Sequence, residues 1–130
     1  MSSIKSFEDL KIWQLSREFC NDVFRITNNE KFSTDYKLKN QIRASAGSIM
    51  DNIAEGFERS GNKELVQFLY ISKGSCGESR SQLYRSLDFK YISEEEFIVL
   101  KQKTIQLSLA IGSFINYLKQ SILKGSKYKK

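Results

Sequence analysis

Residues 38–57 read LKNQIRASAGSIMDNIAEGF, and this stretch decides the fold. Its large apolar side chains recur at intervals of four or seven residues, which places them on one face of an α-helix. They are Leu38, Ile42, Ile49, Ile53 and Phe57. A line of polar side chains runs beside this face, and its members are Gln41, Ser45, Ser48, Asn52 and Glu55. The stretch therefore predicts an amphipathic helix whose core face has a polar edge.

Three short polar segments separate this helix from others with the same period. They lie near residues 28–33, 59–62 and 90–93, and the sequence contains no proline. Ser6 is a suitable cap for the first helix, and Ser93 followed by Glu96 forms a capping box for the last. We therefore predict an all-α, antiparallel up-down four-helix bundle over residues 1–123. The expected helices cover about 7–27, 34–58, 63–89 and 94–123, and residues 124–130 are expected to form a flexible basic tail.

The net charge of +6 is unevenly distributed along the 130 residues. Five of the 21 cations occur from Lys119 onward, where there is no acidic residue, so residues 1–118 hold 16 cations against all 15 acids. The body of the chain is therefore nearly neutral in sum. No apolar run approaches the roughly 18 residues of a membrane span. We expect one soluble, cytoplasmic domain that does not bind a membrane.

Side chains suited to catalysis or metal binding are scarce. Histidine is absent, which excludes Ser-His-Asp and Cys-His nucleophile systems and the Glu-x-x-His metal sites of helical bundles. The two cysteines, Cys20 and Cys76, lie in apolar helical patterns, which indicates reduced packing residues. We expect no enzymatic activity, no small-molecule substrate, no cofactor and no metal site.

The first predicted helix has apolar side chains on two flanks. One flank comprises Leu10, Trp13, Cys20 and Phe24, and the other Ile12, Leu15, Phe19, Val23 and Ile26. An ordinary bundle helix needs an apolar face only slightly wider than about 100°. The excess favours self-association, and the alternative is a wide face that is covered within one chain.

Two stretches of small residues are expected to lie at the same height in neighbouring helices. They read ASAGS at 44–48 and SKGSCG at 72–77. Small side chains let two backbones approach closely, so this pattern predicts a tight helix crossing. For the polar line of residues 41–55, and for Gln67, Glu78 and Gln82 on the following helix, two interpretations remain open. The side chains pair across a subunit contact, or they face solvent.

Aromatic and basic side chains alternate on one face of residues 66–84. Tyr70, Lys73, Arg80 and Tyr84 follow each other at helical spacing, as stacking on unpaired bases and contact with phosphates would require. The alternative is ordinary amphipathic cover. Phosphate contacts are also expected from the tail, where the candidates are Lys124, Lys127, Lys129 and Lys130. A basic tail that only aids solubility is the competing interpretation.

Most of the chain resembles a known family. The matching segments are SFEDLKIWQ at 6–14, QIRA at 41–44, SI at 48–49, NIAEG at 52–56, FLYI at 68–71, GS at 74–75, QL at 82–83 and YIS at 91–93. They are similar to the bacterial four-helix-bundle proteins encoded in intervening sequences of large-subunit ribosomal RNA genes. The motif positions carried over are Gln41, Arg43, Ser48, Asn52, Glu55, Glu78 and Gln82. Within the expected helix 34–58, most of the motif positions lie on the polar line. We therefore interpret the motif as structural or as part of a subunit interface.

The resemblance implies an antiparallel bundle that assembles into a ring-like homopentamer. The related accessory proteins of diversity-generating retroelements are basic scaffolds that bind a reverse transcriptase and nucleic acid. Our leading hypothesis is therefore a non-catalytic homopentameric scaffold associated with RNA or with an RNA-binding protein. The alternative is a protein–protein interaction module that binds another polypeptide and has no nucleic-acid role.

Overall fold

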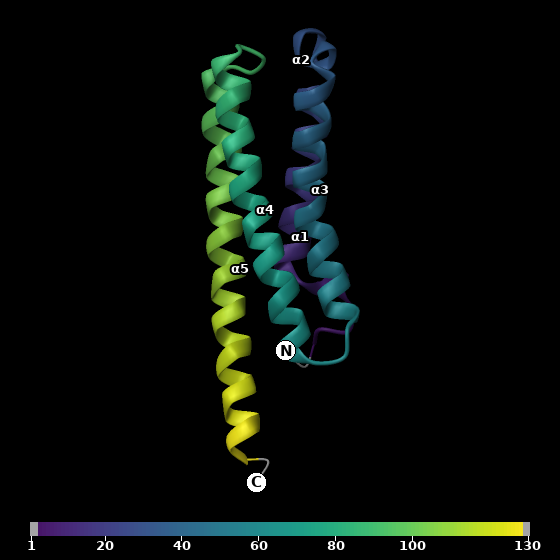
Figure 1. Cartoon of the computed structure of the whole chain (residues 1–130), viewed down its shortest axis with the longest axis vertical. Coiled ribbons are helices and arrows are strands. Elements are labelled where there is room, and N and C mark those ends of the chain that lie inside the picture. Colours follow the sequence, from purple (N-terminus) through teal and green to yellow (C-terminus); the bar gives the residue numbers. More distant parts are fainter. Residues whose placement is uncertain (1–2, 129–130) are drawn as a thin grey trace.

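The computed structural model describes residues 3–128 of the chain, and these residues form helices and turns with no β-strand. The elements are η1 (Phe7–Asp9), α1 (Lys11–Thr27), α2 (Glu30–Thr34), α3 (Tyr36–Glu58), α4 (Asn62–Asp88) and α5 (Glu94–Tyr128). The all-α class is therefore confirmed. Four long helices lie side by side and alternate in direction, with the short α2 across one end (Figure 1).

Each long helix packs against two neighbours, in the order α1, α3, α4, α5 and back to α1. The most extensive contacts are α3 against α4 and α4 against α5, and the contact between α1 and α5 is smaller. The apolar face of residues 38–57 forms the centre of this arrangement, because Ile42, Ile49 and Ile53 are fully buried. Leu69 of α4 and Ile111 of α5 belong to the same hydrophobic core and are also fully buried.

The first helix begins later than the sequence indicates. Residues 7–9 form only a turn of 3₁₀ helix, in which the Asp9 carboxylate accepts hydrogen bonds from the backbone of Lys5 and Ser6 at 2.9 and 3.2 Å. Leu10 then has an extended backbone and is buried, so α1 starts at Lys11. Burial of the Leu10 side chain bends the chain at the point where helix propensity alone would continue it.

The apolar excess of α1 is largely covered within one chain. Phe19 and Val23 are buried in the core, and Trp13 is half-buried against the ring of Phe7, with centroids 5.1 Å apart. Phe24 is 55% exposed, and the Arg43 guanidinium lies 4.5 Å from its ring centroid. The flanks of α1 therefore leave little apolar surface for another subunit, which contradicts the surface argument made from the first helix.

Tyr91 joins the turn between α4 and α5 to the start of α3. Its hydroxyl donates to the Asp35 carboxylate at 2.9 Å, and its backbone oxygen accepts from the Asn29 amide at 2.8 Å. The ring packs against the buried Phe32 of α2, with centroids 5.0 Å apart. The predicted capping box at the other side of this turn is confirmed, since Ser93 and Glu96 exchange hydrogen bonds of 2.9 and 3.1 Å.

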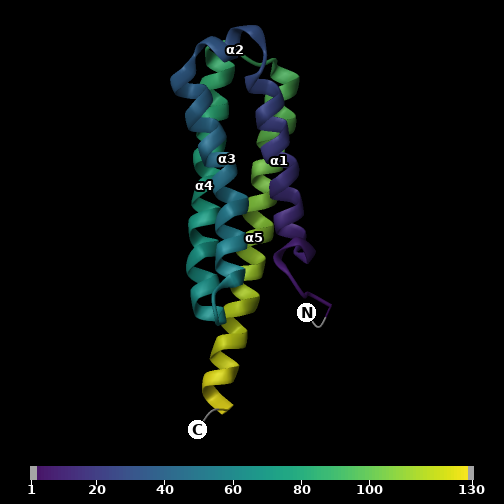
Figure 2. The same ribbon diagram turned by 90° about the vertical axis from the view of Figure 1, so that its right-hand side faces the viewer.

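The last helix does not end near residue 123, because α5 continues to Tyr128. Its lower end projects past the turn between α3 and α4 (Figures 1 and 2). Residues 124–128, expected in a flexible tail, are therefore helical. Lysines near a helix C-terminus interact favourably with the helix dipole, and Gly125 alone costs only about 1 kcal/mol of helix propensity.

Candidate nucleic-acid interface and the α3–α4 seam

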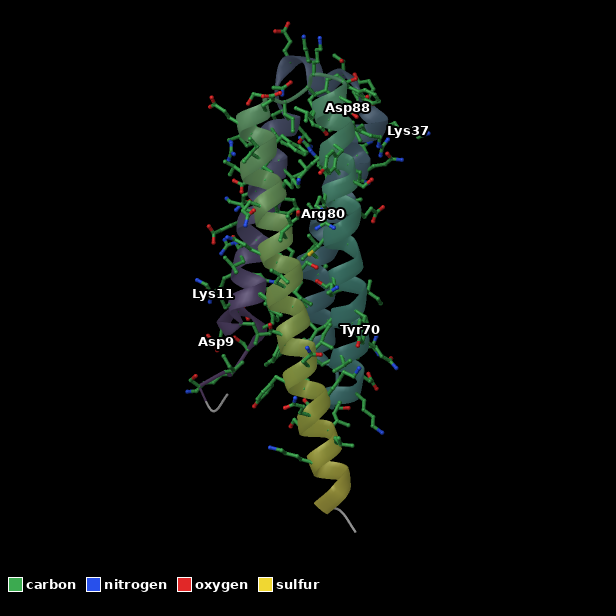
Figure 3. The ribbon with its side chains drawn as sticks, turned by 90° about the vertical axis from the view of Figure 1, so that its left-hand side faces the viewer. Asp9, Lys11, Lys37, Tyr70, Arg80 and Asp88 are labelled. Atoms are coloured by element: carbon green, nitrogen blue, oxygen red, sulfur yellow. The ribbon has the colours of Figure 1, made fainter. Side chains whose placement is uncertain are left out.

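The predicted aromatic and basic residues of α4 lie along the junction of α4 with α5. Two lysines of α5 join them, and we call this set the α4–α5 basic stripe. Its members are Tyr70, Lys73, Arg80, Tyr84, Lys101 and Lys119. Figure 3 looks onto this side of the bundle, where Arg80 lies between the two helices and Tyr70 lies lower on α4.

At the upper part of the stripe, Tyr84 is packed between the two helices. Its ring contacts Phe97 edge-on, with centroids 4.8 Å apart, and the Lys101 ammonium lies 5.4 Å from its centroid. Phe97 is buried, whereas Tyr84 remains 43% exposed. The Tyr84 ring is therefore held by Phe97 and Lys101, while part of its side chain remains open to solvent.

At the lower part, Tyr70 has an equivalent arrangement with Lys119. The Lys119 ammonium lies 5.8 Å from the ring centroid and donates a hydrogen bond of 3.2 Å to the Tyr70 hydroxyl. A shallow groove of about 320 Å³ adjoins this pair, and its lining includes Tyr70, Lys73, Leu109, Gly112 and Asn116. A Cβ atom added at Gly112 would lie 3.5 Å from the Lys73 side chain, an ordinary van der Waals contact, so Gly112 and Lys73 are neighbours across this groove.

The stripe carries positive charge without nearby compensation. Among the described residues, none of its four cations lies within 4.0 Å of a carboxylate. The sequence of α5 has no acidic residue after Glu96, and between residues 66 and 87 α4 has only Glu78. Glu78 is separated from Arg80 by about 200° of helical rotation, at 100° per residue. The net charge of residues 1–118 is close to zero, but these charges are unevenly placed in the fold, and the junction of α4 and α5 is basic.

The cations of the stripe also act on the buried thiol of Cys76. Burial raises the pKa of Cys76 to about 12, although the positive charges of Arg80 and Lys73 act in the opposite direction. Cys76 is fully buried, and it is a free cysteine. A thiol with such a pKa stays protonated at neutral pH and is a poor nucleophile, so it serves as a core packing residue.

The four predicted tail lysines differ in what the structure describes. Lys124 is exposed on α5, and Lys127 belongs to the same helix. Lys129 and Lys130 lie outside the described residues. The structure therefore places the two described lysines on a helix that continues directly from the basic stripe.

Ser45 and Ser48 of the polar line face α4 within the same chain, and we call this contact the α3–α4 seam. Ser45 donates to Oε1 of Gln82 at 2.6 Å, and its oxygen lies 2.8 Å from that of Ser79. Lower in the seam, Ser75 donates to the Ser48 hydroxyl at 2.9 Å. The hydroxyl groups of Ser45 and Ser48 are thus hydrogen-bonded to α4 of the same chain, rather than across a subunit contact or with solvent alone.

Close approach of α3 and α4 depends on serines and on one glycine. A Cβ atom added at Gly47, Gly74 or Gly77 would meet nothing within 4 Å, so these glycines do not form the crossing. At Gly56 the added atom would lie 2.7 Å from Cβ of Phe68. The predicted crossing is therefore confirmed at the serines of both small-residue stretches. The glycines of these stretches do not form it, and Gly56 was not predicted to take part.

The remaining motif residues occupy different environments. Asn52 is half-buried and donates to the Ser48 hydroxyl and backbone at 2.9 and 2.8 Å. Gln41 accepts from Arg85 of α4 at 3.1 Å. Glu55 pairs with Arg59 on the surface of α3, and Glu78 is exposed on α4.

Arg43, another motif residue, connects α3 to the end of α1. Its guanidinium donates to the Thr27 hydroxyl at 2.8 Å and to the Asn28 side chain at 3.0 Å. The same group lies over the ring of Phe24. Four of the seven motif positions therefore make contacts between elements of the bundle, namely Gln41, Arg43, Ser48 and Gln82. Asn52 bonds only within α3.

Sequence reasoning missed two buried serines of α4, Ser79 and Ser86, and the lysines of α5. Together with Ser72 and Ser75, which belong to the predicted small-residue stretch 72–77, they recur at helical spacing and are all buried. That spacing was a detectable signal for a polar seam. Lys101 and Lys119 could be found only by aligning α5 against α4 in opposite directions, which requires the positions of both helix ends.

The described residues contain no arrangement typical of a metal centre or a membrane segment. They include no group of three or more cysteine, aspartate or glutamate side chains placed to hold a metal ion. No helix within residues 3–128 is both long and apolar enough to cross a membrane. Every buried side-chain nitrogen and oxygen in this range has a hydrogen-bond partner.

Comparison with known proteins agrees with the sequence resemblance. A protein of unknown function from the S23 ribosomal protein family of Bacteroides thetaiotaomicron has a similar crystal structure, with a TM-score of 0.74 and 20% sequence identity over 80% of this chain and 97% of that chain. No curated protein matches the chain. Residues 8–113 match the family described as 23S rRNA-intervening sequence protein. The chain therefore belongs to the 23S rRNA-intervening sequence protein family.

Proposed function

We propose that this protein is a non-catalytic, homo-oligomeric scaffold that associates with RNA through the α4–α5 basic stripe. The observation that carries the proposal is the separation of charge in the folded chain. Lys73, Arg80, Lys101 and Lys119 are collected along one junction of two helices, and the acidic residues lie mainly elsewhere. Positive charge of this kind attracts the phosphate backbone of a nucleic acid.

The aromatic residues of the stripe make RNA a better candidate than a merely acidic protein. Tyr70 and Tyr84 are about half exposed and lie among the cations. Protein contacts to unpaired RNA combine aromatic stacking on bases with basic contacts to phosphates. The family name refers to an intervening sequence of 23S rRNA, which is compatible with an RNA role but does not define one.

Self-association is the second part of the proposal. Large aliphatic side chains remain exposed on α5, namely Ile98 at 63%, Leu109 at 67% and Leu123 at 72%. Fully burying one such side chain contributes about 1.5 to 3 kcal/mol, so a contact between copies would be favoured. A pentamer is preferred on the family resemblance, since a bundle surface does not fix the number of copies.

Salt titration of RNA binding tests the proposal. The whole protein is mixed with a fluorescently labelled single-stranded RNA, and the affinity is measured from low to physiological salt. We expect the logarithm of the binding constant to fall linearly with the logarithm of the salt concentration. Each phosphate that the protein contacts should add about 0.7 to the steepness of this slope. The double variant Lys73→Gln/Arg80→Gln should lose about 1.4 from that slope, because it removes two such contacts.

A matched control keeps the net charge equal. Lys11 and Lys37 are exposed on α1 and α3, outside the stripe (Figure 3). The variant Lys11→Gln/Lys37→Gln therefore loses the same charge but should keep most of the native affinity and slope. Equal weakening by both double variants would show that only net charge matters and would contradict the assignment of the stripe.

The alternative function is a protein–protein interaction module. The exposed aliphatic side chains of α5 favour it, because they suit a partner polypeptide as well as a second copy. An apolar contact changes little with salt, whereas a phosphate-driven complex weakens by orders of magnitude. Binding of a polypeptide that is insensitive to salt, together with no RNA affinity at low salt, would establish the alternative.

A further inference from the structure

We propose that the α4–α5 basic stripe binds an unpaired RNA strand in a fixed position, with one base stacked on Tyr70 and another on Tyr84. This inference rests on the proposed RNA association and narrows it to one class of RNA. The stripe is not a uniform basic surface. It consists of two equivalent tyrosine–lysine pairs, each formed by one residue of α4 and one of α5.

The two pairs form at different heights because α4 and α5 are antiparallel, so that a later residue of α4 meets an earlier residue of α5. Tyr84 lies near the end of α4 and meets Lys101 near the start of α5, at 5.4 Å from ring centroid to ammonium. Tyr70, earlier in α4, meets Lys119, later in α5, at 5.8 Å. Each pair therefore offers an aromatic surface for a base and a cation for the adjacent phosphate.

Both rings are already held in position before any ligand arrives. Tyr84 rests edge-on against the buried Phe97, and the Tyr70 hydroxyl accepts a hydrogen bond from Lys119. Tyr70 and Tyr84 nevertheless remain 49% and 43% exposed. A ring fixed in this way loses little conformational entropy when a base stacks on it, which favours binding.

The distance between the pairs sets the length of strand that can span them. Tyr70 and Tyr84 are fourteen residues apart on one helix, which corresponds to about 21 Å at 1.5 Å per residue. A stacked strand advances about 3.4 Å per phosphate, so roughly six nucleotides cover this distance. Lys73 and Arg80 lie between the two tyrosines and are placed to contact the intervening phosphates.

The aromatic pairs favour an unpaired strand over a duplex. In a duplex, both faces of each base are stacked inside the helix and only phosphates, sugars and base edges are accessible. A tyrosine ring can then contribute little. In an unpaired strand, the base can leave its neighbours and stack on the ring.

The test compares two RNA probes on the full-length protein. The first is a labelled oligouridine about twice the spanning length, and the second is a hairpin with the same number of phosphates. The variants Tyr70→Leu and Tyr84→Leu remove stacking but keep an apolar side chain. Tyr36→Leu is the matched control, because Tyr36 is 69% exposed and has the Lys39 ammonium 5.1 Å from its ring, but lies outside the stripe.

We expect the oligouridine to bind more tightly than the hairpin. Each of Tyr70→Leu and Tyr84→Leu should weaken oligouridine binding by about 5- to 150-fold, the equivalent of one lost base stack. The control Tyr36→Leu should leave the affinity unchanged. Lys101→Gln and Lys119→Gln should each reduce the salt slope for oligouridine by about 0.7.

Two results would overturn the inference and are distinguishable from failure of the proposed function. Equal affinity for hairpin and oligouridine would show that the stripe reads only phosphate charge. Unchanged affinity of both tyrosine variants, with weakened lysine variants, would lead to the same conclusion, and in both cases RNA association would stand. If neither probe binds at low salt, the proposed function fails together with this inference. Circular dichroism of each variant verifies that the helices remain folded.

Discussion

Ser45 of α3 donates a 2.6 Å hydrogen bond to the side-chain oxygen of Gln82 of α4, and both residues are buried. The bond to Gln82 is the shortest that the Ser45 hydroxyl makes, so we assign its single proton to that bond, and the Ser79 hydroxyl then acts as the donor in its 2.8 Å contact with Ser45. The three side chains thus form one directed chain of hydrogen bonds in the α3–α4 seam. Such networks are stable only when every member is satisfied.

Substitution of Ser45 by alanine should destabilise the fold. The variant leaves the Gln82 oxygen buried without its donor, which costs about 1 to 3 kcal/mol. Chemical denaturation followed by circular dichroism measures the change in the free energy of unfolding. The control is Ser81→Ala, an exposed serine of α4, which should change that free energy by less than about 0.5 kcal/mol. Equal effects of the two variants would mean that the seam bond contributes nothing.

Alanine should have opposite effects at two glycines. At Gly56 the new Cβ would lie 2.7 Å from Cβ of Phe68, so Gly56→Ala should cost about 1 to 3 kcal/mol through overpacking. At Gly74, in the middle of α4, nothing lies within 4 Å of the new atom, and Gly74→Ala should stabilise the protein by about 0.5 to 1 kcal/mol. Melting temperatures of the two variants should therefore lie on opposite sides of the native value. Destabilisation by Gly74→Ala would indicate that another copy packs closely on this part of α4.

The two motif residues Asn52 and Glu55 should behave differently. Asn52 is half-buried and bonded to Ser48, so Asn52→Ala should lower the free energy of unfolding by about 1 kcal/mol. Glu55 and its partner Arg59 have side chains that are about half exposed, and such pairs contribute little. Glu55→Ala should leave the melting temperature almost unchanged. A smaller assembly of Glu55→Ala in light scattering would instead assign Glu55 to a subunit contact.

Stability on the acid side should depend on the bond between Asp35 and Tyr91. The hydrogen bonds from the Leu38 backbone and then from Tyr91 lower the pKa of Asp35 below its usual 3.8, and the same contact raises the pKa of Tyr91. A lowered carboxyl pKa stabilises the fold above about pH 4, and this contribution is lost as the pH falls through the folded-state pKa. The difference in unfolding free energy between the native protein and Tyr91→Phe should therefore be largest near neutral pH and shrink below about pH 4.

The raised pKa of Tyr91 predicts the behaviour on the alkaline side. Folding favours the neutral form of the Tyr91 phenol. The stabilisation that this phenol contributes to the fold is therefore present below about pH 10 and is lost as the pH rises through its raised pKa in the folded state. Urea denaturation at a series of acid, neutral and alkaline pH values measures the unfolding free energy for both predictions. The control Tyr36→Phe removes an exposed hydroxyl and should show no such pH dependence relative to the native protein. A Tyr91→Phe difference that is constant with pH would contradict the assigned role of the bond.

Assembly is expected at micromolar concentration. Size exclusion with light scattering should give a mass well above 15.1 kDa, with five times that value favoured by the family resemblance. The variant Ile98→Gln/Leu109→Gln removes exposed apolar surface without touching the core and should shift the protein toward smaller species. A native mass of 15.1 kDa that does not change on dilution would contradict self-association.

The sequence was sufficient for the class of fold and for the approximate course of its helices, because a helical apolar period without proline indicates long amphipathic helices. It failed where a single buried side chain overrides local propensity, as at Leu10, and where a helix continues without neighbours, as after Leu123. The α4 half of the basic stripe was predictable, since Tyr70 and Tyr84 lie on one helix. The α5 half was not, because pairing Lys101 with Tyr84 requires the relative shift of two helices.

The part of α5 that projects beyond the α3–α4 turn has a dynamic consequence. Ile122 still packs against the core, whereas Leu123 and Lys124 are exposed, so the part of α5 after Ile122 receives little support from other helices. An isolated helical segment of this length is marginal in water. Its amide hydrogens should exchange with solvent by fraying from the C-terminal end, without unfolding of the rest of the chain. Protection should therefore decline residue by residue after Ile122, and this overhang should open and close while the bundle stays intact.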